Sequence, residues 1–148
     1  MIRYAHTNII ARDSRKLIDF YKAVFDCRSI GQTRDLCGEW LDKLTGMPGA
    51  HIVGEHLVLP GFGDSYPTLE IFSYDTMIDM PAQRVNVYGF AHIAFQVDDV
   101  EETLKKLLSH GGQMVGEVVR HEFPDGHTAT FVYATDIEGN IVEIQSQE

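Results

Sequence analysis

The stretch "YAHTNIIARDSRKLIDFYKAVF", residues 4–25, has a second version later in the chain, "FAHIAFQVDDVEETLKKLLSHGG", residues 90–112. Aligned on Ala-His, both versions begin with an aromatic residue and continue as an alternating strand. Each has an aspartate seven residues after the histidine, where a helical pattern begins. Self-similarity of this kind predicts two copies of one supersecondary unit. The fold should therefore be built from two similar modules.

Each repeat predicts one helix with recognisable ends. The first should run from about Ser14 to Phe25, with its apolar residues at helical spacing and Asp13 as the N-cap. The second should run from about Val100 to His110. One of two overlapping Asp-x-x-Glu capping boxes within residues 98–102 would begin it, and the Gly-Gly pair that follows would end it.

The repeats also end alike, in the alternating strands "TLEIFSY" (68–74) and "IVEIQSQ" (141–147). Between helix and closing strand each repeat has room for two more strands, which we expect near Arg28–Gln32, His56–Leu59, Met114–Arg120 and Thr128–Ala134. The predicted fold class is α+β, with two βαβββ modules forming a curled mixed sheet around a trough. We expect a single domain over residues 1–148. Its first module would span 1–75 with an inserted loop at 33–66, and its second would span 88–148.

Composition limits the possible partners. The net charge is −10, from 22 acidic residues against 12 Lys and Arg. That balance argues against nucleic acid and anionic membranes, because phosphate contacts need clustered cations. No apolar run approaches about 20 residues, the start has no signal-like segment, and Cys27 and Cys37 form no disulfide framework or zinc spacing. We expect a cytoplasmic protein with reduced thiols and a small-molecule partner.

Strand alternation places four ionisable side chains on the faces turned away from the helices. They are His6 and Glu70 in the first module and His92 and Glu143 in the second. Ionised glutamates on a half-buried face are costly unless they are paired or bind a cation. Two imidazoles and two carboxylates suit one divalent ion such as Ni²⁺, Zn²⁺, Co²⁺, Mn²⁺ or Fe²⁺. The trough is therefore predicted to bind a metal; the alternative is exposed, salt-bridged glutamates beside ordinary histidines.

Other polar and aromatic residues have weaker assignments. Four residues on the same strand faces as the predicted ligands are candidates for substrate contact, with packing as the alternative for the aromatic ones: Asn8, Phe72, Tyr74 and Gln96. His121 and His127 flank a turn signal and are expected in an exposed loop. Three further histidines fit no ligand spacing: His51, His56 and His110.

The motifs "YAHTNIIARDSRKLIDFYKAVFD", "TLEIFSY", "YGFAHIAFQVDDV" and "DIEGNIVEIQ", taken in order, resemble the vicinal oxygen chelate superfamily. That family includes glyoxalase I, methylmalonyl-CoA epimerase, fosfomycin-resistance proteins, extradiol dioxygenases and bleomycin-binding proteins. The resemblance implies paired βαβββ modules, often completed in a homodimer. The His-Glu-His-Glu set is most similar to that of bacterial glyoxalase I, whereas the epimerases usually have Gln at the position of Glu70.

The resemblance implies a metal-dependent isomerase or lyase that abstracts a proton next to a metal-bound carbonyl. Glu143 would be both base and ligand, with Glu70 as its counterpart. The alternatives are a metal-dependent dioxygenase or thiol transferase of the same superfamily, or a non-catalytic binder of the bleomycin type. Two glutathione-contacting positions of glyoxalases are Ile10 and Tyr74 here, which argues against glutathione. The 33–66 insertion would be a substrate lid or a short amphipathic helix containing Trp40.

Overall fold

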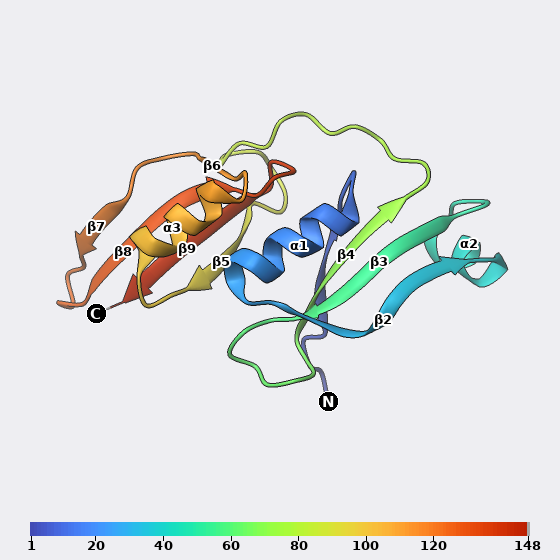
Figure 1. The fold of residues 1–148 in the computed structure, drawn as a ribbon, viewed down its shortest axis with the longest axis horizontal. Coiled ribbons are helices and arrows are strands. Elements are labelled where there is room, and N and C mark those ends of the chain that lie inside the picture. The colour runs from blue at the N-terminus through green and yellow to red at the C-terminus, as the bar shows by residue number, and fades with distance from the viewer. Residues whose placement is uncertain (148) are drawn as a thin grey trace. The chain divides into compact units, whose positions relative to one another are not determined.

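A computed structural model describes residues 1–147 (Figure 1). The chain divides into two compact units, Met1–Met80 and Pro81–Glu148. Each unit contains one mixed sheet with a helix packed across it. The predicted α+β class and the repeat of one strand–helix–strand module are both confirmed.

In the first unit the sheet order is β1-β4-β3-β2, with β1 parallel to β4 and the other neighbours antiparallel. The elements in chain order are β1 (His6–Ile10), α1 (Ser14–Phe25), β2 (Arg28–Cys37), α2 (Glu39–Thr45), β3 (His51–Val58) and β4 (Thr68–Tyr74).

In the second unit the order is β5-β9-β8-β6, with β5 parallel to β9, and β7 also pairs with β8. The elements are β5 (His92–Gln96), α3 (Val100–Ser109), β6 (Gln113–Met114), β7 (Val119–Glu122), β8 (Thr128–Thr135) and β9 (Ile141–Gln147). The single strand predicted near Met114–Arg120 is thus two short strands, β6 and β7.

Both long helices begin as their sequences predict. The Asp13 carboxylate accepts a hydrogen bond from Lys16 N at 3.1 Å, and the Asp99 carboxylate accepts one from Glu102 N at 2.9 Å. Asp99, rather than Asp98, is therefore the N-cap of α3. The second glycine after α3, Gly112, is required by close packing, because a Cβ there would lie 2.3 Å from Leu107 Cδ2 and 2.5 Å from Thr135 O.

The helix faces predicted to be apolar form the core of each unit. Helix α1 packs against β3 and β4, and α3 packs against β8 and β9. The side chains that meet there are buried: Leu17, Tyr21, Leu69 and Ile71 in the first unit, and Leu104, Leu107, Val142 and Ile144 in the second. The opposite face of each sheet therefore carries the ionisable side chains. No helix within residues 1–147 is long and apolar enough to cross a membrane.

The insertion predicted as a loop at 33–66 is largely regular structure. Strand β2 continues past a bulge between Ile30 and Arg34, and β3 starts at His51, earlier than predicted. Helix α2 lies between them. Its Leu41 is 2% exposed and packs in a small cluster with Ala50, Ile52 and Phe72. The insertion therefore adds a second small core to the first unit.

Candidate metal and substrate site

The first unit brings two of the predicted ligands together. His6 lies on β1 and Glu70 on the adjacent parallel strand β4. His6 Nε2 is 3.4 Å from Glu70 Oε2. The glutamate side chain is 12% exposed, whereas the histidine side chain is 44% exposed. The pair thus places a mostly buried carboxylate beside an imidazole that solvent can reach.

The second unit brings the other two predicted ligands together in the same way. His92 lies on β5 and Glu143 on the parallel strand β9. His92 Nε2 is 3.0 Å from Glu143 Oε2. The Tyr133 ring lies against His92, with their centroids 5.0 Å apart. Each predicted His–Glu pair is therefore in contact within its own unit.

The two pairs occupy equivalent places in the two modules. His6 is aligned with Thr68, so Glu70 lies two residues beyond the partner of its histidine. His92 is aligned with Ile141, and Glu143 again lies two residues further along. The repeat found in the sequence is therefore also a repeat of side-chain geometry on the sheet.

His56 is a member of the first-unit cluster that sequence reasoning missed. It lies on β3 directly opposite Glu70 in the antiparallel register, and its Nε2 is 3.1 Å from Glu70 Oε1. Burial lowers the pKa of His56, against the opposing effect of the Glu70 charge. The sequence signal was the strand parity of "HIVGEHLV", which becomes informative only once the β3–β4 register is known.

The Glu143 side chain lines a pocket on the sheet of the second unit. The pocket has a volume of about 530 Å³, within the range typical of small-molecule sites. Aromatic side chains and amides share its lining with the carboxylate: Phe123, Phe131, Tyr133, Gln145 and Gln147. The second module therefore offers room for a small ligand directly beside its candidate base.

A buried carboxylate fixes the turn that leads into β9. Asp136 is 2% exposed and accepts hydrogen bonds from Glu138 N at 2.8 Å and from Asn140 N at 3.0 Å. Asn140 Nδ2 donates to its other oxygen at 2.9 Å. Satisfied donors around a buried carboxylate hold a turn rigidly. This turn sets where β9 begins and thereby fixes the position of Glu143 on that strand.

The residues predicted to contact substrate fall in different surroundings. Asn8 Nδ2 donates to Glu70 Oε2 at 3.3 Å, and Gln96 is exposed on β5. Phe72 is buried in the Leu41 cluster, and Tyr74 packs against that cluster. Both aromatic side chains therefore take part in packing beneath α2.

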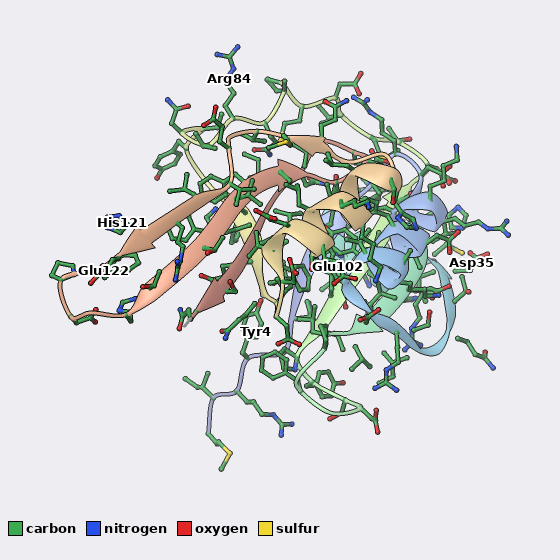
Figure 2. The ribbon with its side chains drawn as sticks, turned by 60° about the vertical axis from the view of Figure 1, so that its left-hand side comes forward. Tyr4, Asp35, Arg84, Glu102, His121 and Glu122 are labelled. Atoms are coloured by element: carbon green, nitrogen blue, oxygen red, sulfur yellow. The ribbon has the colours of Figure 1, made fainter. Side chains whose placement is uncertain are left out.

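The remaining histidines lie elsewhere. His121 is exposed on the edge strand β7, not in a loop, near the tip of the β7–β8 hairpin (Figure 2). His127 stacks on Phe123 in the turn and contacts Asp125. His51 binds two carboxylates at the other end of the first sheet: its Nδ1 lies 2.7 Å from Asp75 Oδ2, and its Nε2 lies 2.7 Å from Asp35 Oδ1.

The chemistry of each pair suits a divalent ion. Two donors bound to one ion at about 2.1 Å lie about 3.0 Å apart at a right angle and about 3.4 Å apart at the tetrahedral angle. The His–Glu separations of 3.0 Å and 3.4 Å match these values. Within residues 1–147 no three His, Cys, Asp or Glu side chains are grouped so that they could hold a metal ion. Each unit therefore supplies two donors, and the four-ligand set stays a prediction.

A family model matches residues 3–144, nearly the whole chain. The chain belongs to the Glyoxalase/Bleomycin resistance protein/Dioxygenase superfamily. This confirms the resemblance to the vicinal oxygen chelate superfamily. No curated protein sequence matches the chain.

Solved structures share the fold at low sequence identity. A glyoxalase family protein from Bacillus cereus has a TM-score of 0.76 at 23% identity, over 99% of this chain and 93% of that one. A glyoxylase/bleomycin resistance protein/dioxygenase domain from Frankia sp. has a TM-score of 0.64 at 14% identity, over 100% and 99%. The fosfomycin resistance protein FosX from Listeria monocytogenes, crystallised with Mn(II) and sulfate, has a TM-score of 0.59 at 17% identity, over 99% and 93%.

Proposed function

We propose that the protein is a metal-dependent isomerase or lyase that moves a proton next to a carbonyl group of a small substrate. One observation carries the proposal: an imidazole–carboxylate pair recurs in the same register in both modules. Each pair, His6 with Glu70 and His92 with Glu143, would supply ligands to a divalent ion. The Mn(II) in the FosX structure, which has the same fold, agrees with metal use on this scaffold.

The metal, when bound, would act as a Lewis acid toward the substrate carbonyl oxygen. Glu143 would move the proton. Its Oε2 lies beside His92 Nε2, so Oε1 is the oxygen left to accept a proton from the carbon next to the carbonyl. The same carboxyl group would return the proton to the adjacent carbon or to the opposite face.

Metal content tests the proposal first. The protein should be purified without chelators or metal-affinity resin and then analysed for its elements. We expect about one Ni, Zn, Co, Mn or Fe per chain, bound by imidazole and carboxylate donors. The His6→Ala and His92→Ala variants should each lose the ion, whereas the His121→Ala control, altered on the exposed edge strand, should keep it. A wild-type protein that neither contains nor takes up a metal would sink the proposal and favour a non-catalytic binder.

Proton exchange tests the chemistry. α-Hydroxycarbonyl compounds and thioesters, incubated with the metal-loaded protein in deuterium oxide, should gain deuterium at the carbon next to the carbonyl. Oxygen consumption without such exchange would instead identify an oxygenase of the same superfamily. A cytoplasmic location and a homodimer also remain part of the proposal, and the dimer can be checked by light scattering.

A further inference from the structure

The two glutamates of the candidate site differ in how firmly they are held. Both oxygens of Glu70 have partners: Oε1 lies 3.1 Å from His56 Nε2, while Oε2 lies 3.4 Å from His6 Nε2 and 3.3 Å from Asn8 Nδ2. In the described part of the chain, the Glu143 carboxylate has one such partner, His92, on Oε2. Within residues 1–147, Glu143 Oε1 has no such partner.

The residue opposite the glutamate differs between the two modules, and this explains why Glu70 has more partners than Glu143. His56 lies directly opposite Glu70 in the β3–β4 register. Tyr133 lies directly opposite Glu143 in the equivalent β8–β9 register. The modules therefore match at the histidine and the glutamate but differ at the residue across from the glutamate. A histidine reaches the carboxylate there, whereas the tyrosine ring packs on His92.

We propose that His56 is a positioning residue whose Nε2, in contact with Glu70 Oε1, fixes the orientation of that carboxylate. Its side chain is 23% exposed and that of Glu70 is 12% exposed, so little water competes for the contact. With Oε1 occupied, the carboxylate presents Oε2 toward His6. The metal-binding part of this inference rests on the proposed function, but the contact between His56 and Glu70 does not.

The consequence is a division of roles between the two glutamates. A carboxylate held at both oxygens loses less conformational freedom on binding an ion, and such outer contacts orient ligands in metal sites. Glu70 is therefore the fixed ligand. Glu143, with one oxygen unattached and facing the pocket, is the carboxylate that can move a proton.

Zinc titration of the metal-free protein tests the positioning role without measuring activity. Two variants are compared with wild type: His56→Leu removes the polar contact, and His56→Gln keeps a polar side chain at the same position. Loss of a contact of this kind weakens metal binding by about 10- to 100-fold. We expect that loss for His56→Leu and a Zn²⁺ affinity close to wild type for His56→Gln. Equal affinities for His56→Leu and wild type, with both variants folded by circular dichroism, would overturn the proposal.

Nitrogen-15 NMR of the imidazoles separates this inference from the proposed function, because it uses the metal-free wild-type protein. We expect a His56 Nε2 signal that shifts in Glu70→Ala, because the 3.1 Å contact with the carboxylate is lost. A signal unaffected by Glu70→Ala would overturn the inference even if zinc binds. If wild type takes up no zinc, the proposed function fails, and this spectrum alone decides whether His56 orients Glu70.

Discussion

His92 Nε2 lies 3.0 Å from Glu143 Oε2, across parallel strands in which the glutamate follows the partner of the histidine by two residues. The first module repeats this offset with its own pair, at 3.4 Å. A single buried His–Glu contact is an ordinary way to satisfy a carboxylate. Two contacts in the same register show that the two modules repeat the geometry of the side chains as well as that of the backbone.

Replacement of the candidate base should separate catalysis from folding. Glu143→Gln keeps the size and hydrogen-bonding capacity of the side chain but cannot accept the proton. We expect the deuterium exchange rate of a verified substrate to fall by about 100- to 10,000-fold, the usual contribution of a general base. The thermal midpoint should change little.

Glu122→Gln is a matched control, because Glu122 is exposed on β7 and does not line the pocket beside Glu143. It should exchange deuterium at nearly the wild-type rate. A fully active Glu143→Gln protein would show that Glu143 is not the base.

Metal removal should lower stability, because an ion that binds only the folded state stabilises it by mass action. With free Zn²⁺ at about 100 times its Kd, the free energy of unfolding should rise by about 2.7 kcal/mol over the chelator-treated protein. Thermal unfolding with and without chelator measures the difference. His6→Ala should show little response to zinc. An identical response from His6→Ala and wild type would place the bound zinc elsewhere.

The sequence was sufficient to predict the repeated module and which faces of its strands carry the histidines and glutamates, because both depend on local periodicity. Strand parity around His6 and His92 and the helix caps at Asp13 and Asp99 are properties of neighbouring residues. The family match and the two sheets confirm the fold derived from them. The ligand assignment itself stays a prediction.

The role of His56 could not be predicted in this way, because it depends on strand register. Its contact with Glu70 links β3 and β4 and needs the alignment that pairs the two residues. The bulge between Ile30 and Arg34 likewise allows β2 to continue past Gly31. The sequence of this segment predicts a loop. Register and bulges are set by pairing between strands and not by the composition of one strand.

The insertion helix should stabilise the first unit through one residue. Leu41 is 2% exposed beside Phe72, whereas Leu44 on the same helix is 75% exposed. Leu41→Ala should reduce the free energy of unfolding by about 2–5 kcal/mol, the usual cost of a large-to-small core change. Leu44→Ala should change it by less than about 0.5 kcal/mol. Urea denaturation of both variants checks this, and equal small effects would argue that α2 is a lid with no packing role.

The His51 cluster should make stability depend on pH in a predictable direction. Hydrogen bonds that the imidazole donates to Asp75 and to Asp35 raise the pKa of His51 above its ordinary value of 6.5. A raised folded-state pKa means that the folded protein holds the proton more tightly than the unfolded chain. The resulting stabilisation is complete below the unfolded pKa and is lost as the pH rises through the folded pKa. Because the cluster is solvent-exposed, the effect should be small.

Comparison with a variant that stays neutral isolates this contribution. His51→Gln removes the titrating group, so the stability difference between wild type and variant should be largest below the unfolded pKa of about 6.5 and shrink as the pH rises through the higher folded pKa. Urea denaturation across this range measures the difference. His110→Gln is the control, because His110 contacts a backbone carbonyl and a hydroxyl, not a carboxylate. A His51→Gln difference that stays constant with pH would show that the two carboxylates do not hold a protonated imidazole in the folded protein.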